Sequence, residues 1–566
     1  MISKTRPRTR GRRPSPFHPP SARPRIEQLE ERCLPSADIV LQWNSHALDA
    51  VKNDYNVGGI TDEGGPTKTS RALAIVQAAV YDAADAVDRQ YAPYLVNIQA
   101  KPGTSIVAAI SQAAHDTLAA LFPHQKGAFD TELVQSLKGI PADAAQKGIQ
   151  LGHSVAAQIL AARANDGSSI NAPYTPGIFP GQWRPDPLHP SQTALGPGWG
   201  YVTPFAIQSG AQFQAPPPPA LTSPTYTAAF DLLKAIGGDG VHTPTVRTPE
   251  QTVIGQFWAY DGSPQVGTPP REYNQILQII AQQEGNTLMQ NARLFALANM
   301  AMADAAITAW FTKYTYDYWR PVTAIREADP GTGPTGLGDG NPKTHGDIHW
   351  TPLGASMDNG SPNGPDYTPP FPAYTSGHAA IGAAMFRTVQ DFYQTDHIAF
   401  SWMSDEYNGV TVDQYGKVRP AVARHYDTLS QAAYENAESR IYLGIHWPWD
   451  RDNGLKQGAA VADYTVRHEL QPLGLPSGSA DQNPAAALPG GGASQENMSF
   501  SPHSAQAPRS DTSILARIVS LELITSGAPS TLGQGSAGHV RRASSPNAAA
   551  ITAPVDSVFA GPDWWA

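Results

Sequence analysis

The stretch ARLFALANMAMADAAITAWFTKYTYDYWR, residues 292–320, decides the fold class of this 566-residue chain. Alanine is abundant in it, and apolar residues recur at three- and four-residue spacing, as in a helix that packs on other helices. Four further segments have the same periodicity: 70–91, 105–122, 142–166 and 271–286. Strand-like alternation is scarce, so the sequence predicts an all-α protein built of helical bundles.

Composition divides the chain into three parts. Residues 1–38 are basic and rich in Pro and Arg, and residues 476–566 consist mainly of Ser, Ala, Gly, Pro and Gln. Both are predicted to be mostly disordered, because such segments have little apolar surface to bury. Residues 39–475 are predicted to form one α-helical domain. Its helices are separated by long Pro- and Gly-rich loops, notably 168–224 and 329–371.

The N-terminal segment bears on localisation. It is positively charged but has no convincing apolar stretch, so it is not a standard secretory signal. The piece IEQLEERCLPSAD, residues 26–38, resembles an export-associated tag, with an ordinary charged linker as the alternative. No run of about 18 apolar residues is evident. We therefore expect a soluble protein without a membrane span that is exported or held at the cell surface.

Charge and cysteine content exclude two further classes. The formal net charge is −10 and the pI is near 5.9, so a general nucleic-acid binder is not expected. Cys33 is the only cysteine, which rules out an intramolecular disulfide and a cysteine-rich metal site.

The first chemical motif is KYTYDYWRP, residues 313–321. Lys313 and Arg320 stand seven apart, so on a continuous helix they would lie two turns apart on one face. Cations buried among so many aromatic residues need an anionic partner or cost several kcal/mol each. The alternative is an ordinary solvated charged face.

The second motif is FPAYTSGHAA, residues 371–380, which leads into an apolar periodic run. Ser376 and Gly377 are residues typical of a helix start, where free backbone N–H groups and the positive end of the dipole favour an anion. His378 adds a titratable group. The alternative is a plain helix cap with a surface histidine.

The third motif is SRIYLGIHWPWD, residues 439–450. Gly444 would allow a close backbone approach, and Pro448 is expected to end the helix just after His446. Asp450 is placed either to hold a ring nitrogen of His446 or to cap the next helix. Together the three motifs supply the cations, hydrogen-bond donors and two histidines that a tetrahedral oxyanion and its chemistry require.

The pattern Lys-x6-Arg-Pro, Ser-Gly-His, Ser-Arg-x3-Gly-x-His-x3-Asp resembles the signature shared by vanadium haloperoxidases and type 2 phosphatidic acid phosphatases. One position departs from it, because Thr375 stands where the family usually has Pro. Over roughly residues 39–470 the chain is similar to the fungal vanadium chloroperoxidases in particular. The segments that carry this likeness are 257–276, 292–297, 345–347 and 369–379.

The resemblance implies a fold of two four-helix-bundle-like halves and a role for each matched residue. The residues implied to hold vanadate are Lys313, Arg320, Ser376, Gly377 and Arg440. His446 would ligate vanadium, with Asp450 behind it. His378 would be the acid–base residue, paired with Asp261, and Lys313 would polarise peroxide. Trp310 and Phe371 would line a halide pocket, although both also fit plain core packing.

The implied activity is that of a vanadate-dependent haloperoxidase. It would oxidise chloride, bromide or both with hydrogen peroxide to hypohalous acid, and an organic acceptor is left open. Phosphate fits the same site as vanadate, so the alternative is a soluble phosphate-monoester phosphatase that uses a phospho-His446 intermediate. A protein that keeps the fold without catalysis is a third hypothesis. The helix start should lower the pKa of His378 and Asp261 should raise it, and the sequence leaves the balance open.

Overall fold

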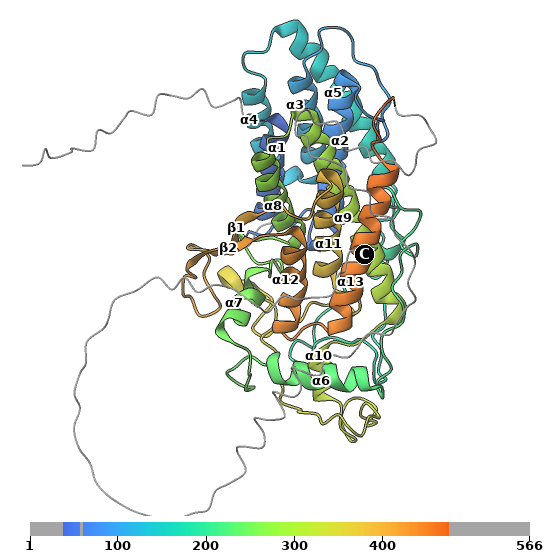
Figure 1. The fold of residues 1–566 in the computed structure, drawn as a ribbon, viewed down its shortest axis with the longest axis vertical. Coiled ribbons are helices and arrows are strands. Elements are labelled where there is room, and N and C mark those ends of the chain that lie inside the picture. Colours follow the sequence, from blue (N-terminus) through green and yellow to red (C-terminus); the bar gives the residue numbers. More distant parts are fainter. Residues whose placement is uncertain (1–37, 57–59, 475–566) are drawn as a thin grey trace, which may run out of the picture. The chain divides into compact units, whose positions relative to one another are not determined.

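The computed structural model describes residues 38–56 and 60–474 (Figure 1). The predicted C-terminal tail, and the predicted N-terminal segment except Asp38, lie outside the described residues. The described part contains thirteen α-helices and one small sheet, which agrees with the all-α fold class.

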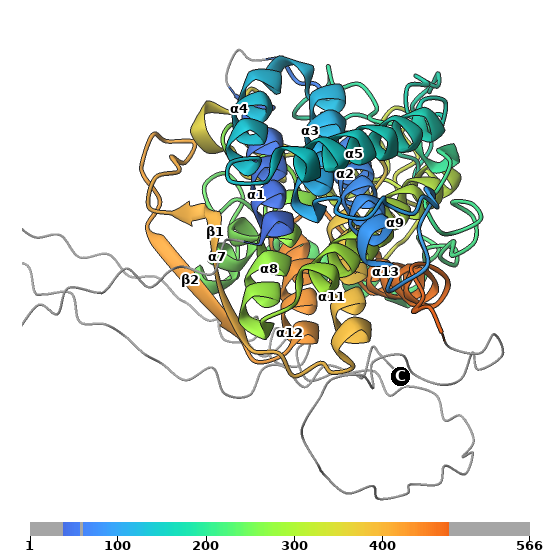
Figure 2. The same cartoon turned by 90° about the horizontal axis from the view of Figure 1, so that it is seen from above.

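The helices form two groups. The first group contains α1 (Ile39–Asn53), α2 (Gly65–Asp88), α3 (Ile106–Leu121), α4 (Lys126–Ser136) and α5 (Ala142–Arg163). The second contains α8 (Pro269–Glu284), α9 (Leu288–Tyr316), α11 (Gly377–Tyr393), α12 (Leu429–Tyr442) and α13 (Pro448–His468). Figure 2 shows the first group on one side of α9 and α11, α12 and α13 on the other.

Helix α9 belongs to both groups because it is apolar all round. Ala296, Met300 and Ala303 pack in the core of the first group, whereas Phe295 and Met302 pack in the core of the second. A helix with apolar residues on every face must be buried on every face. The helix is long and apolar enough to span a membrane, with a mean hydropathy of 1.4, but 94% of that window is buried inside the protein. It is therefore a central core helix.

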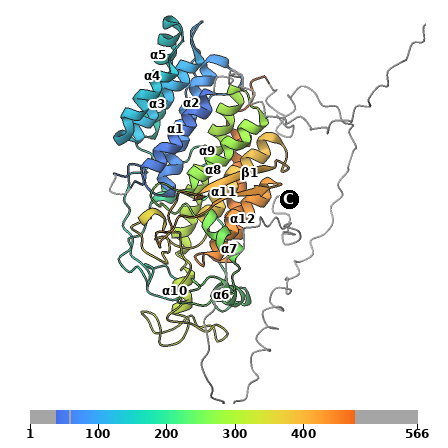
Figure 3. The same cartoon turned by 90° about the vertical axis from the view of Figure 1, so that its left-hand side faces the viewer.

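The remaining elements surround one end of the second group, as Figure 3 shows for α6 (Pro224–Ile236) and α10 (Pro321–Arg326). Helix α7 (Pro249–Phe257) and two short 3-10 turns complete this region: η2 (Trp199–Tyr201) and η3 (Asp358–Gly360). A third 3-10 turn, η1 (Pro123–Gln125), joins α3 to α4 in the first group. Here the C-terminal end of α9 meets the N-terminal ends of α11 and α13. The backbone N–H of Ser376 donates to the carbonyl of Asp450 over 3.0 Å and ties the last two together.

The sheet was not expected from the sequence. Strands β1 (Phe400–Asn408) and β2 (Ala421–Tyr426) form an antiparallel pair in which Phe400 faces Tyr426. The register is irregular between Met403 and Asn408. Such an irregularity breaks the simple two-residue alternation by which a strand is recognised in a sequence.

Candidate active site

Lys313 and Arg320 come from different elements, so the expectation of one continuous helix is wrong. Helix α9 ends at Tyr316, Asp317 takes a left-handed conformation, and Arg320 is the N-cap of α10. The two side chains still converge. Lys313 is fully buried, and its Nζ donates to the carbonyls of Pro372 and Ala373 over 2.9 and 3.0 Å.

Arg320 contacts the surrounding loops through two of its three guanidinium nitrogens. Its Nε donates to the carbonyl of Phe371 over 3.0 Å. Its Nη1 donates to the carbonyl of Ile445 over 2.8 Å and lies 3.0 Å from Nε2 of His446. An arginine only donates, so Nε2 of His446 is the acceptor and carries a lone pair.

His446 is held from its other side by Asp450. Its Nδ1 lies 2.8 Å from Oδ2 of Asp450, and the same oxygen accepts the backbone N–H of Trp447 over 3.1 Å. Both roles left open for Asp450 therefore apply, since it orients His446 and caps α13. Pro448 opens α13, and the expectation that it ends the preceding helix just after His446 is wrong, because α12 already ends at Tyr442.

Gly444 makes the sharp turn between α12 and His446 possible. It has a φ of 71°, and a Cβ at this position would lie 2.5 Å from the carbonyl oxygen of Gly237. Only glycine combines this backbone conformation with such a close approach. The close contact expected at Gly444 is therefore present.

Ser376 is the N-cap of α11, as the sequence predicts, and its Oγ accepts the N–H of Ala379 over 3.3 Å. His378 lies in the first turn, and its Nε2 is 2.7 Å from the carbonyl oxygen of Ala259. A carbonyl only accepts, so Nε2 carries the hydrogen, and Nδ1 is the nitrogen left to take or give a proton.

The expected pairing of Asp261 with His378 is not what the structure shows. Both carboxylate oxygens of Asp261 accept from Nη2 of Arg440, over 2.7 and 2.9 Å. A permanently charged guanidinium is a stronger partner for a carboxylate than a buried imidazole. Burial is the main cause that lowers the pKa of His378 well below its usual value, with Arg440 next.

The same electrostatics act on the rest of the site. Burial, then the neighbouring Arg320, lowers the pKa of Lys313 well below its usual value. Burial, then Arg320 and Lys313, does the same to His446. Burial raises the pKa of Asp450 to about 7. Burial is the largest cause of each shift. Neighbouring positive charge adds to it for Lys313, His378 and His446, and a bound anion would offset that part.

The donors that lack partners fit such an anion. Nη2 of Arg320 and both Nε and Nη1 of Arg440 are buried without a hydrogen-bond partner among the described residues. Buried unpaired donors of this kind are costly unless a ligand fills the space between them. Lys313, Arg320 and Arg440 face Asp261 and Asp450, while burial raises the pKa of the nearby Glu272 well above its usual value and keeps it neutral. The site can therefore accept further negative charge. These donors suit a tetrahedral oxyanion whose central atom can be bound by Nε2 of His446.

The site opens into a cavity of about 370 Å³. Seven of the predicted residues line it: Asp261, Trp310, Phe371, Gly377, His378, Arg440 and His446. Lys313, Arg320, Ser376 and Asp450 lie outside this lining set. The rings of Trp310 and Phe371 are 4.8 Å apart, and Nζ of Lys313 lies 5.0 Å from the Phe371 ring.

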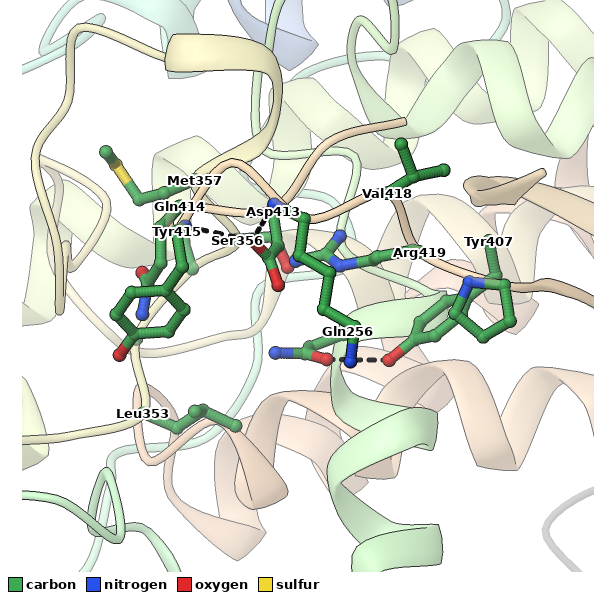
Figure 4. Close-up of a pocket in the computed structure, with 14 residues that line it drawn as sticks. Gln256, Leu353, Ser356, Met357, Tyr407, Asp413, Gln414, Tyr415, Val418 and Arg419 are labelled. Atoms are coloured by element: carbon green, nitrogen blue, oxygen red, sulfur yellow. Dashed lines mark hydrogen bonds between the residues drawn. The ribbon is translucent and has the colours of Figure 1, made fainter. Parts of the chain in front are cut away.

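A second pocket, shown in Figure 4, contains none of the predicted site residues. It lies between α7, residues 353–357 and the loop that joins β1 to β2, and its volume is about 200 Å³. Gln256 accepts a hydrogen bond from Tyr407 over 2.6 Å at its edge. It has neither a histidine nor a cluster of unpaired donors among its lining residues.

Comparison with known proteins identifies the family to which the chain belongs. The chain is 31% identical over 516 residues to the vanadium chloroperoxidase of Curvularia inaequalis, and the match covers 75% of this chain and 81% of that protein. The chain belongs to the vanadium haloperoxidase family. A family model described as the VCPO second helical-bundle domain matches residues 293–474, which contain the three motifs.

Solved structures share the fold of this family member. A bacterial vanadium-dependent iodoperoxidase is 24% identical with a TM-score of 0.61, and the match covers 76% of this chain and 97% of that one. The holo form of a bacterial vanadium-dependent chloroperoxidase is 16% identical with a TM-score of 0.55, over 74% and 96% of the two chains. At these identities the likeness concerns the fold.

The sequence did not indicate the buried hydrogen bonds that connect two of the motifs. The hydroxyl of Thr375 donates to Oε1 of Gln457 over 2.7 Å, and Nε2 of Gln457 donates to the hydroxyl of Thr312 over 2.9 Å. All three residues are buried. This chain of bonds joins the residue before Ser376 to the residue before Lys313. The departure from Pro at position 375, noted in the sequence, was the only available signal.

Proposed function

We propose that this haloperoxidase holds vanadate at His446 and oxidises halide with hydrogen peroxide to hypohalous acid. The observation that carries the proposal is the set of buried, unpaired guanidinium donors of Arg320 and Arg440 beside His446. Nε2 of His446 carries a lone pair that accepts from Arg320 here and would bind a ligand in place of that hydrogen bond. Bound vanadate would supply Lewis-acid activation of peroxide. Family membership supports vanadate over other oxyanions, and phosphate serves as a control ligand of similar shape.

Each residue of the site has a separate role in binding vanadate or activating peroxide. Nε2 of His446 ligates the metal, and Asp450 keeps the opposite nitrogen protonated and the ring in place. Arg320, Arg440, Ser376, Gly377 and Lys313 donate to the anion's oxygens. Lys313 has two of its hydrogens on carbonyls, so its third is available to polarise a reacting oxygen.

His378 serves as the acid–base group through its Nδ1. Its low pKa keeps it neutral while no anion is bound, and negative charge in the site raises that pKa toward the working range. Trp310 and Phe371 form the drier side of the cavity, where fixed positive charge acts more strongly on a halide. These aromatic residues favour chloride competence over activity restricted to bromide.

The test uses protein stripped of phosphate and reloaded with vanadate. Peroxide-dependent halogenation of a cyclic diketone is followed with chloride and with bromide, beside a phosphatase assay on the vanadate-free protein. His446→Ala should lose both tight vanadate binding and halogenation, whereas His378→Ala should keep vanadate but lose halide oxidation. Normal turnover in His378→Ala would refute its assignment. Phosphatase activity without halogenation would refute the proposed function.

A further inference from the structure

We propose that the cavity in front of His446 is a binding site for an apolar, aromatic organic acceptor, which is halogenated while it is bound. This inference rests on the proposed function, because it concerns what happens to the oxidised halogen. The first argument is size. The cavity of about 370 Å³ equals about twelve water molecules at ~30 Å³ each. Hydrogen peroxide and one halide need only a small part of that volume, whereas pockets for organic ligands begin at roughly 300 Å³.

The second argument is the chemistry of the walls. Apart from the catalytic end, the cavity is lined mainly by aromatic rings, prolines and aliphatic side chains. They include Tyr55, Pro66, Leu195, Tyr367, Pro370 and Ile381, which come from several separate segments of the chain. The only Asp, Glu, Lys or Arg residues in the lining are Asp261 and Arg440, and they bind each other. A neutral wall of flat and apolar groups favours a neutral, flat and apolar molecule.

The third argument is position. Leu195 faces the start of α2, since a Cβ on Gly65 would lie 3.3 Å from its Cδ2, so these two segments together bound the cavity. Gly377, His378, Arg440 and His446 also line it. A molecule held between the apolar walls and these residues would therefore be next to the place where halide is oxidised. Free hypohalous acid would need no such site.

Tyr367 adds a polar contact for orientation. Its hydroxyl has no hydrogen-bond partner among the described residues, and burial raises its pKa above the usual value, so it remains a donor. A phenol or carbonyl oxygen is the matching acceptor. The expected ligand class is therefore a phenol or a related aromatic compound with one oxygen substituent.

The reaction balances as ArH + X⁻ + H₂O₂ + H⁺ → ArX + 2 H₂O. The O–O bond of peroxide breaks and takes up two electrons. A carbon–halogen bond forms, the ring C–H bond breaks, and the ring proton leaves to water. The halide and peroxide are the substrates of the proposed function, so the acceptor is the only further reactant.

A competition experiment tests the inference. The vanadate-loaded enzyme receives equal concentrations of 2-naphthol and a hydrophilic cyclic diketone, and the product ratio is compared with that from reagent hypohalous acid added slowly to the same mixture. We expect the enzyme to favour the naphthol at least tenfold more than the reagent does. In a second measurement, calorimetry of 2-naphthol with the phosphate-loaded protein should show saturable binding.

Variants tie both measurements to the cavity. Leu195→Asn places a polar amide of similar size on the apolar wall and should weaken naphthol binding at least tenfold while moving the product ratio to the reagent value. Leu337→Asn is the matched control, because Leu337 is 60% exposed and does not line the cavity. Tyr367→Phe should weaken binding of 2-naphthol but not of naphthalene, which has no oxygen.

A product ratio equal to that of the reagent, or a lack of saturable naphthol binding, would overturn the inference. Iodide oxidation without any acceptor is measured in parallel. If iodide is oxidised while the ratio equals the reagent value, the enzyme releases hypohalous acid and only the acceptor site is wrong. If iodide is not oxidised, the proposed function fails, and the calorimetry on the phosphate-loaded protein still decides whether the cavity binds an aromatic molecule.

Discussion

Lys313→Met should separate the effect of this buried charge on protein stability from its effect on anion binding. Lys313 is 0% exposed, and its charge lies among other cations with only two carbonyls as hydrogen-bond partners. A buried charge without an ionic partner destabilises a fold. Methionine has a similar length and an adaptable shape, so it fills the space without the charge. We expect the anion-free variant to melt at the same temperature as the parent protein or higher.

The same change should nearly abolish anion binding. Two unit charges about 4 Å apart interact by about 4 kcal/mol at an effective dielectric constant near 20. A loss of this size raises the Kd for vanadate or phosphate by about 10³-fold. At a ligand concentration of 100 times the parent's Kd, ligand binding stabilises the parent by about 2.7 kcal/mol and the variant by almost nothing.

The pH dependence of the free energy of unfolding provides an independent test. The pKa of Lys313 in the anion-free folded protein is lowered from 10.5, so between that lowered value and 10.5 the unfolded chain binds more protons than the folded one. The free energy of unfolding of the parent should therefore rise with pH across this window. Lys313→Met should lack that rise.

Melting curves with and without vanadate, repeated across pH, measure all three effects. Lys126→Met is the matched control, because Lys126 is an exposed lysine that pairs with Asp130 outside the site. The reasoning is refuted if Lys313→Met melts well below the parent without anion and still shows the full vanadate-induced shift.

Three further substitutions test the structure around the site. Thr375→Val keeps the shape but removes the buried donor to Gln457, so vanadate titration should show a Kd about tenfold higher, and Thr375→Ser should restore it. A parent-like Kd in the valine variant would exclude a positioning role. Asp304 accepts three backbone N–H groups of one loop and burial raises its pKa to about 6. Asp304→Ala should therefore lower the free energy of unfolding in urea by about 3–6 kcal/mol, and a loss below about 1 kcal/mol would contradict this. Gly444→Ala would force a Cβ against Gly237 at a positive φ, so it should lower the melting temperature and weaken vanadate binding together. A binding curve unchanged from the parent would show that this turn does not position the site.

Periodicity and local signals were enough for most of the central helices. The segments at 70–91, 105–122, 142–166, 271–286 and 292–320 became α2, α3, α5, α8 and α9 within a few residues, except that α9 stops before Arg320. The start of α11 at Ser376 was also predictable. Helix spacing and N-cap chemistry act between residues three or four apart, and a sequence records such relations directly.

The sheet shows where local reasoning stops. The partner strands β1 and β2 are joined by a loop of about a dozen residues, and their register is irregular. Strand pairing depends on residues distant in the chain, and a bulge hides the alternation that would signal it. Similarly, α12 ends at Tyr442 and Pro448 starts α13, whereas the sequence suggested that Pro448 ends a helix.

For the site, the sequence by itself determined which chemical groups are available: three cations, two histidines, a helix start with Ser-Gly, and a carboxylate four residues after His446. Tertiary structure decided how they are used. It paired Asp261 with Arg440, 179 residues away, instead of with His378. It also joined Thr375 to Thr312 through Gln457, and enclosed an apolar cavity with residues that come from as far apart in the chain as Tyr55 and His446. Motif spacing conveys what neighbouring residues can do together, whereas the partner of a buried charge and the volume of a cavity depend on which distant segments pack around them.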